Sequence, residues 1–186
     1  MARISLEPPR TLLNRFVRWY SRRSFGRELG PALAAGHNPA VLKTQLKLER
    51  GMSKCDTVAQ DLKHLAMLKT AMTIGCEWCV DFGYWKSRED GVAPEKIDAV
   101  GAWRDSAAFT SLERLALEYS EAMTHTPPQV TDELVAALRE RLSDAQLVEL
   151  TAAIALENTF GRTNSALGIT PEGFKEECAL PTRQVG

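Results

Sequence analysis

The stretch Asp61–Gly83, DLKHLAMLKTAMTIGCEWCVDFG, contains the features that decide the fold of this chain. Apolar residues recur at helical spacing through its first half, and the pattern then breaks at Gly75. A second helix, led by Cys76 and Cys79, follows the break and is expected to end before Gly91, because glycine favours a helix C-terminus. The pattern therefore predicts two helices joined at a glycine, with a Cys-x-x-Cys pair at the start of the second.

The same apolar period of about 3.6 residues runs through most of the chain, and no segment shows the alternation of a convincing strand. Two capping boxes, Thr110–Glu113 and Ser143–Gln146, mark further helix starts. We therefore expect an all-α protein of seven or eight helices. The expected helices cover residues 10–25, 39–51, 57–73, 76–90, a segment that begins at Pro94, and residues 111–124, 131–142 and 144–160.

Length and composition are those of an ordinary globular chain. The 186 residues are 44% hydrophobic and 25% charged, and a chain of this size can bury a core without disulfides or a metal. We find no linker long enough to separate domains, so one unit is expected over residues 1–186. It would comprise an N-terminal helical lead-in (1–56), a Cys-x-x-Cys helical hairpin (57–91) and a second helical half (92–186).

The charge pattern excludes several classes of protein. The formal net charge of −1 argues against a surface designed as a whole for nucleic acid. No apolar run approaches the ~18 residues that a membrane span needs, and the arginine-rich N-terminus lacks the apolar stretch of a signal peptide. We therefore expect a soluble, cytoplasmic protein with no membrane span and no nucleic-acid partner.

The cysteine pair supports three interpretations. Structural zinc needs about four ligands, but Cys55 and Cys178 stand alone and the histidines are scattered, so no metal is expected. Cys76 and Cys79 could also be buried small hydrophobes. A redox pair fits their position better, because a helix start stabilises thiolates and two thiols one turn apart can close a disulfide. Cys55 and Cys178 are expected to take no part.

A faint similarity at an offset of 85 residues relates residues 61–65 to residues 146–150. If it reflects an internal duplication, the second copy has Gly161 and Asn164 where the first has its cysteines. That second copy would then be structural. Asp81, two residues beyond the second cysteine, is expected on the helix surface rather than at a catalytic centre.

An all-α chain with a helix, a glycine, Cys-x-x-Cys and a further helix resembles the carboxymuconolactone decarboxylase and alkylhydroperoxidase-D-like superfamily. The similar segments are Asp61–Gly83 and Gln146–Gly168 (QLVELTAAIALENTFGRTNSALG), with Arg22–Gly26 (RRSFG) as a lead-in. The resemblance implies a helical fold, homo-oligomers such as trimers or hexamers, and no bound cofactor. It would also place a group of polar residues near the subunit contacts: Glu157, Asn158, Arg162 and Asn164. The alternative role of this group is helix capping.

In the peroxidase branch of this superfamily, a cysteine pair cycles between dithiol and disulfide while it reduces hydroperoxides. The resemblance assigns attack on the peroxide to Cys79 and resolution of the resulting sulfenic acid to Cys76. An external thiol reductant would restore the dithiol. The decarboxylase branch acts on a lactone and does not need the pair, so the pair favours reduction of a hydroperoxide or a disulfide.

Two positions differ from the proton relay of the peroxidase branch. The family pattern has a glutamate twelve residues before the first cysteine and a histidine four after the second, where this chain has His64 and Gly83. We hypothesise that a chain reversal at Gly75 brings His64 opposite Gly83, so that the imidazole takes the proton of Cys79 directly or through one water. The alternative is a buried histidine whose ring is satisfied by a backbone partner.

Two other classes of function stay open. An enzyme that acts on a lactone or a related small acid would use the same pocket, with His64 as base and the cysteines as lining. A non-catalytic helical assembly module would use neither. Joint loss of two thiols after peroxide treatment would separate the redox interpretation from both.

Overall fold

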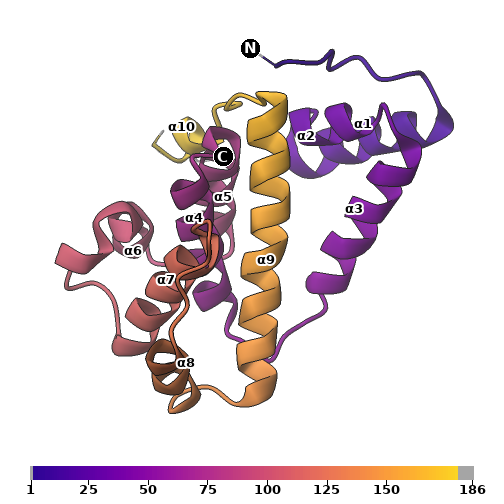
Figure 1. The fold of residues 1–186 in the computed structure, drawn as a ribbon. Coiled ribbons are helices and arrows are strands. Elements are labelled where there is room, and N and C mark those ends of the chain that lie inside the picture. The colour runs from indigo at the N-terminus through magenta and orange to yellow at the C-terminus, as the bar shows by residue number, and fades with distance from the viewer. Residues whose placement is uncertain (1, 180–186) are drawn as a thin grey trace.

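The computed structural model describes residues 2–179, so that residue 1 and residues 180–186, the ends of the expected 1–186 unit, lie outside it. This part of the chain forms α-helices and one 3-10 helix but no β-strand, which confirms the all-α fold (Figure 1). In chain order the elements are α1 (Leu12–Phe25), α2 (Gly30–Ala35), α3 (Pro39–Met52), α4 (Gln60–Ile74), α5 (Glu77–Glu89), α6 (Pro94–Ala99), the 3-10 helix η1 (Val100–Asp105), α7 (Ser111–Thr124), α8 (Asp132–Arg139), α9 (Asp144–Leu167) and α10 (Phe174–Ala179).

Every expected helix is present, and the described residues contain two short helices more than the sequence predicts, α2 and α10. The helix α2 lies between the predicted helices 10–25 and 39–51, and it begins with Gly30 and Pro31 because proline is well tolerated in the first turn of a helix. The helix α9 is longer than predicted because Gly161 does not interrupt it. It ends at Gly168, which adopts a left-handed conformation with φ of 66°.

The helices α4 and α5 form an antiparallel hairpin that reverses at Gly75. This residue has φ of 76°, a left-handed conformation that glycine adopts without steric cost. Across the hairpin, His64 meets Asp90, and Leu68 lies beside Gly83. The reversal that the sequence predicts is therefore present, although its register differs from the expected one.

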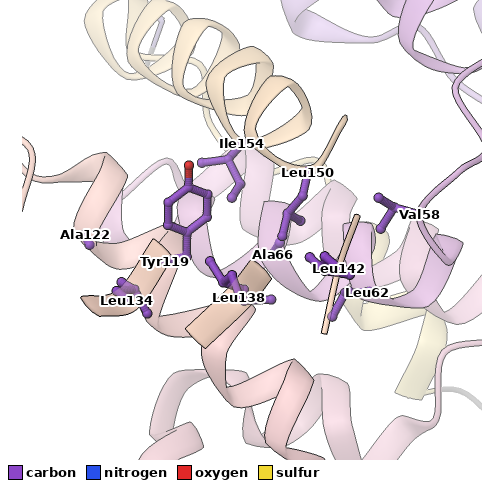
Figure 2. Close-up of a cluster of buried hydrophobic side chains, with 11 residues drawn as sticks. Val58, Leu62, Ala66, Tyr119, Ala122, Leu134, Leu138, Leu142, Leu150 and Ile154 are labelled. Carbon is purple, nitrogen blue, oxygen red and sulfur yellow. The ribbon is translucent and has the colours of Figure 1, made fainter. Parts of the chain in front are cut away.

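The core forms around α4, which packs against α5, α7 and α9. In Figure 1, α9 crosses the molecule as its longest helix, with α1–α3 on one side and α6–α8 on the other. Figure 2 shows side chains from α7 and α8 turned toward those of α4 and α9. This cluster is formed by Val58, Leu62, Ala66, Ala116, Tyr119, Ala122, Leu134, Leu138, Leu142, Leu150 and Ile154.

A buried ion pair connects α4 to α9. Lys63 Nζ lies 2.6 Å from Glu149 Oε1, and each side chain is 6% exposed. Further hydrogen bonds complete the pair, since Lys63 also donates to the Cys55 carbonyl and the Thr57 backbone N–H donates to Glu149 Oε2. Burial alone would raise the pKa of Glu149, but the hydrogen bonds from Lys63 and Thr57 lower it to about 2.

We predict that Glu149→Gln lowers the free energy of unfolding by about 3–5 kcal/mol at pH 7, because it leaves the Lys63 ammonium buried without its counter-charge. Urea unfolding followed by circular dichroism measures this. Arg139→Gln is the matched control, since it removes an exposed pair with Asp144 and should cost less than about 1 kcal/mol.

The same pair predicts a pH dependence. Because the folded-state pKa of Glu149 lies below the ordinary value of 4.5, its contribution to stability is complete above that pH and is lost as the pH falls toward 2. The wild type should therefore lose more stability between pH 5 and pH 3 than Glu149→Gln does. Equal stability of the two proteins at pH 7 would contradict this interpretation of the ion pair.

Candidate functional site

Cys76 and Cys79 lie at the first turn of α5 and form a disulfide. Their Cα atoms are 5.3 Å apart, within the range that disulfide geometry allows. Cys76 is the N-cap of α5, and its Sγ accepts the backbone N–H of Cys79 at 3.2 Å. Because the N–H groups at a helix start stabilise negative charge, this position favours a Cys76 thiolate when the pair is reduced.

The other two cysteines are free, as the sequence predicts. Cys55 is exposed in the loop after α3, and Cys178 is partly buried in α10. Burial raises the pKa of the Cys178 thiol, which makes it a weaker nucleophile at neutral pH. Neither thiol belongs to the site at the start of α5.

The helix α9 supplies the nearest polar neighbour of the pair. Asn164 Nδ2 lies 3.5 Å from Cys79 Sγ, and the Asn164 side chain is 5% exposed. One turn earlier, a Cβ atom added at Gly161 would lie 3.7 Å from the Cys76 Cβ and 2.8 Å from the Ile74 side chain. These are the two positions that the 85-residue offset aligns with the cysteines. The offset was the one sequence signal that could have placed Asn164 at the site.

An apolar cluster covers the two sulfurs. Cys76 is 1% exposed and Cys79 is 6% exposed, and they share their cluster with Trp78 and with Ala34 of α2. The Trp78 ring stacks on Phe82 with ring centroids 5.1 Å apart. Such surroundings exclude water, which strengthens local electrostatic interactions and protects reactive intermediates from side reactions.

The structure does not bring His64 to Cys79. His64 Nε2 lies 2.6 Å from Asp90 Oδ2, and Asp90 is eleven residues beyond Cys79 along α5, a rise of about 16 Å. The hairpin register explains the difference, because Leu68 rather than His64 lies beside Gly83. Burial lowers the pKa of His64, although the Asp90 carboxylate opposes this effect. The geometry favours a structural role for His64, although its partner is the Asp90 side chain rather than the expected backbone group. The contact joins the start of α4 to the end of α5.

Asp81 is buried, which corrects the expectation that it lies on the surface. Its carboxylate accepts backbone N–H groups from Glu172 at 2.8 Å, Phe174 at 3.2 Å and Lys175 at 2.7 Å. These bonds hold α10 and the segment before it against α5. Because they join residues about ninety positions apart, no local pattern could indicate them.

Part of the polar group on α9 has a structural role. Asn158 Nδ2 donates to Thr124 Oγ1 at 3.0 Å, and Arg162 Nη2 donates to the Thr124 carbonyl at 2.7 Å, so both hold the end of α7 against α9. Glu157 differs, because its Oε1 is buried without a hydrogen-bond partner. Burial raises the pKa of Glu157 to about 8, so its carboxyl group is largely protonated at neutral pH.

Two hollows lie near the pair. The larger, about 890 Å³, is an open groove along the start of α5 and the segment before α10, and Glu77 and Asp81 line it. The smaller, about 130 Å³, lies between α2, α3 and α9, and Asn164 lines it.

Within residues 2–179, no cluster of three or more His, Cys, Asp and Glu side chains is placed to hold a metal ion. No helix in this part of the chain has the length and apolar character needed to cross a membrane.

We predict that His64→Gln leaves the pKa of the Cys79 thiol unchanged, because the imidazole lies at the far end of α5. The pH dependence of Cys79 alkylation in the reduced protein, followed by mass spectrometry, tests this. The variant should instead lose about 1–3 kcal/mol of stability with its charge-assisted hydrogen bond. A shift of the Cys79 thiol pKa by a full unit in this variant would show that His64 does influence the cysteine site.

Comparison with known proteins gives a consistent assignment. The family model of the carboxymuconolactone decarboxylase family matches residues 39–122. The uncharacterized protein YnjA of Escherichia coli (strain K12) is 39% identical over 174 residues, which cover 89% of this chain and 90% of that protein.

Solved structures share the fold. The alkylhydroperoxidase AhpD core of an uncharacterized peroxidase-related protein from Ralstonia eutropha JMP134 gives a TM-score of 0.84 at 18% identity, covering 97% of this chain and 98% of that one. The debrominase Bmp8 in its apo form gives a TM-score of 0.81 at 19% identity, covering 92% and 94%. The solved structures show the shared all-α fold, and the family match together with the relative shows that this chain belongs to the carboxymuconolactone decarboxylase family.

Proposed function

We propose that this protein is a thiol-dependent oxidoreductase that reduces a hydroperoxide through Cys76 and Cys79. The observation that carries the proposal is the environment of the two sulfurs. Cys76 Sγ accepts the Cys79 backbone N–H, and Cys79 Sγ lies within reach of the Asn164 amide. Each sulfur therefore has an N–H donor that stabilises its thiolate, inside an apolar cluster that excludes water.

The reaction has two steps. The Cys79 thiolate attacks an oxygen of the hydroperoxide, the O–O bond breaks, and an alcohol leaves after it takes up a proton, while Cys79 becomes a sulfenic acid. The Cys76 thiolate then attacks the Cys79 sulfur, and the hydroxyl group leaves as water. Two thiols are oxidised to one disulfide, and the hydroperoxide is reduced to an alcohol and water.

An external thiol completes the cycle. It attacks Cys79, the more exposed of the two cysteines, and Cys76 leaves as a thiolate that the start of α5 stabilises. A second external thiol then releases the mixed disulfide and restores the dithiol. The position of Cys76 at the N-cap thus favours both its attack on the sulfenic acid and its departure during reduction.

The lactone alternative has less support, because His64, its proposed base, lies against Asp90 and away from the pair.

We also propose that the chain forms homo-oligomers, as its family resemblance implies. Four large side chains on α1 support this, since they are exposed by 49–82%: Leu12, Phe16, Trp19 and Tyr20.

We predict that Cys79→Ser and Cys76→Ser each lower hydroperoxide consumption in the presence of dithiothreitol by at least about 100-fold, because the cycle loses its nucleophile or its resolving thiol. Cys55→Ser is the matched control and should keep the wild-type rate. Peroxide consumption is measured directly, so that the identity of the natural reductant does not matter.

Trapping of the sulfenic acid separates the two roles. Dimedone should label Cys79 in the Cys76→Ser variant after one equivalent of peroxide, and it should label neither position in Cys79→Ser. The reverse pattern would assign the attack to Cys76. An unchanged rate of hydroperoxide consumption in both single variants would contradict the proposed function.

A further inference from the structure

The buried cysteine pair raises the question of how a substrate reaches Cys79. Cys79 is 6% exposed, and neither cysteine is among the residues that line the two nearby hollows. A substrate must therefore pass other side chains before it reaches the sulfur of Cys79. The two hollows differ in which side of α5 they approach, in size and in charge.

The larger groove lies along the face of α5 that is opposite Cys79. Its lining residues on this helix, Glu77, Val80 and Asp81, are spaced three and four residues apart and so share one face. Cys79 lies two residues before Asp81 and therefore faces the opposite side. Glu172 and Glu176 add further carboxyl groups to the groove, with Lys175 as the single basic residue among its lining residues.

The smaller cavity approaches the sulfur of Cys79. Asn164 lines this cavity, and the same side chain places its Nδ2 3.5 Å from Cys79 Sγ. Ala34 also lines it and belongs to the apolar cluster that contains both cysteines. Asn164 thus contacts both the cavity and the reacting sulfur.

The size and chemistry of this cavity limit what it can hold. Its volume of about 130 Å³ is close to that of an engineered cavity, ~150 Å³, that holds a benzene molecule. Its walls combine apolar side chains with amide and hydroxyl groups and one imidazole, and they include no carboxylate, lysine or arginine. The lining residues are Pro31, Ala34, Ala35, His37, Asn38, Val41, Gln45, Thr163, Asn164 and Leu167.

We propose that this cavity is the entry pocket to Cys79 and that it admits a small, uncharged hydroperoxide, such as hydrogen peroxide or a short-chain alkyl hydroperoxide. The proposal rests on the peroxide reduction proposed above and names its substrate class. Asn164 acts as a positioning residue, because its amide carries two N–H groups. One donates to the Cys79 thiolate, and the other is available to an oxygen of the peroxide.

The route is tested by alkylation of Cys79 with iodoacetamide in the Cys76→Ser background, where serine preserves the N-cap. Thr163→Phe, which fills the entry pocket, should slow the alkylation by about 10-fold or more. Small changes in volume within an apolar pocket typically change rates by at least this factor. Val41→Trp, at the exposed rim, is a second filling variant in case the first fails to fold. Glu176→Trp, in the opposite groove, is the matched control and should react at the unmodified rate.

If Glu176→Trp alone slowed the alkylation of Cys79, or if all variants were alkylated at equal rates, the proposed entry route would be wrong. Because alkylation needs no peroxide, the result is separable from the proposed function. Blocked alkylation in a protein that reduces no peroxide would support the route and overturn the hydroperoxide as its occupant. Unimpaired peroxide reduction by the filled variants would overturn the pocket and leave the peroxidase activity intact.

Substrate size provides the second readout. The wild type should reduce hydrogen peroxide and tert-butyl hydroperoxide with a higher kcat/KM than a long-chain fatty-acid hydroperoxide, which is too large and carries a carboxylate. Thr163→Ala, which enlarges the pocket, should narrow this difference. A preference of the wild type for the fatty-acid substrate would overturn the assigned substrate class.

The positioning role of Asn164 has its own test. Asn164→Leu keeps a similar volume but removes the N–H donor, so the pKa of the Cys79 thiol should rise by about one unit. The pH profile of Cys79 alkylation reports this change, which a purely structural role would not produce. An unchanged profile in a folded Asn164→Leu protein would overturn the positioning role.

Discussion

The chain reversal at Gly75 is the constraint on which the cysteine site depends. Gly75 adopts a left-handed conformation that other residues enter only with strain, and this conformation ends α4 and lets α5 begin at the next turn. Cys76 thereby becomes an N-cap, and its sulfur receives an N–H from the first turn of α5. A continuous helix would offer neither the cap nor the free N–H groups that stabilise a thiolate.

The second requirement is the register of α4 against α9. The Lys63–Glu149 pair holds these helices together at one end. At the other end, Gly161 allows α9 to approach the cysteine turn closely enough for Asn164 to reach Cys79 Sγ. The stability of the core and the geometry of the site are therefore coupled, because both depend on how α9 lies along α4.

The features that could be predicted from the sequence are local. The capping boxes at Thr110 and Ser143 open α7 and α9 as expected, and the break at Gly75 lies where the apolar pattern stops. The pairing of Cys76 with Cys79 was also accessible, because two thiols one turn apart lie within reach of each other. The short helix α2 was missed because a Gly-Pro start is typical of both loops and first turns of helices.

The features that could not be predicted depend on contacts between distant segments. His64 was placed opposite the wrong turn of α5, because sequence spacing does not determine the register of a helical hairpin. The burial of Asp81 depends on α10, and the role of Asn164 depends on how α9 packs. The internal duplication, the division of the chain into three parts and the cytoplasmic location stay predictions.

The central claim is that the cysteine pair transfers two electrons to one hydroperoxide within the folded protein. Rapid mixing of the reduced protein with less than one equivalent of hydrogen peroxide, followed by acid quenching and mass analysis, tests it most directly. The account predicts one Cys76–Cys79 disulfide for each peroxide consumed, with Cys55 and Cys178 still reduced. Peroxide that survives the reduced protein, or oxidation spread over all four cysteines, would contradict it.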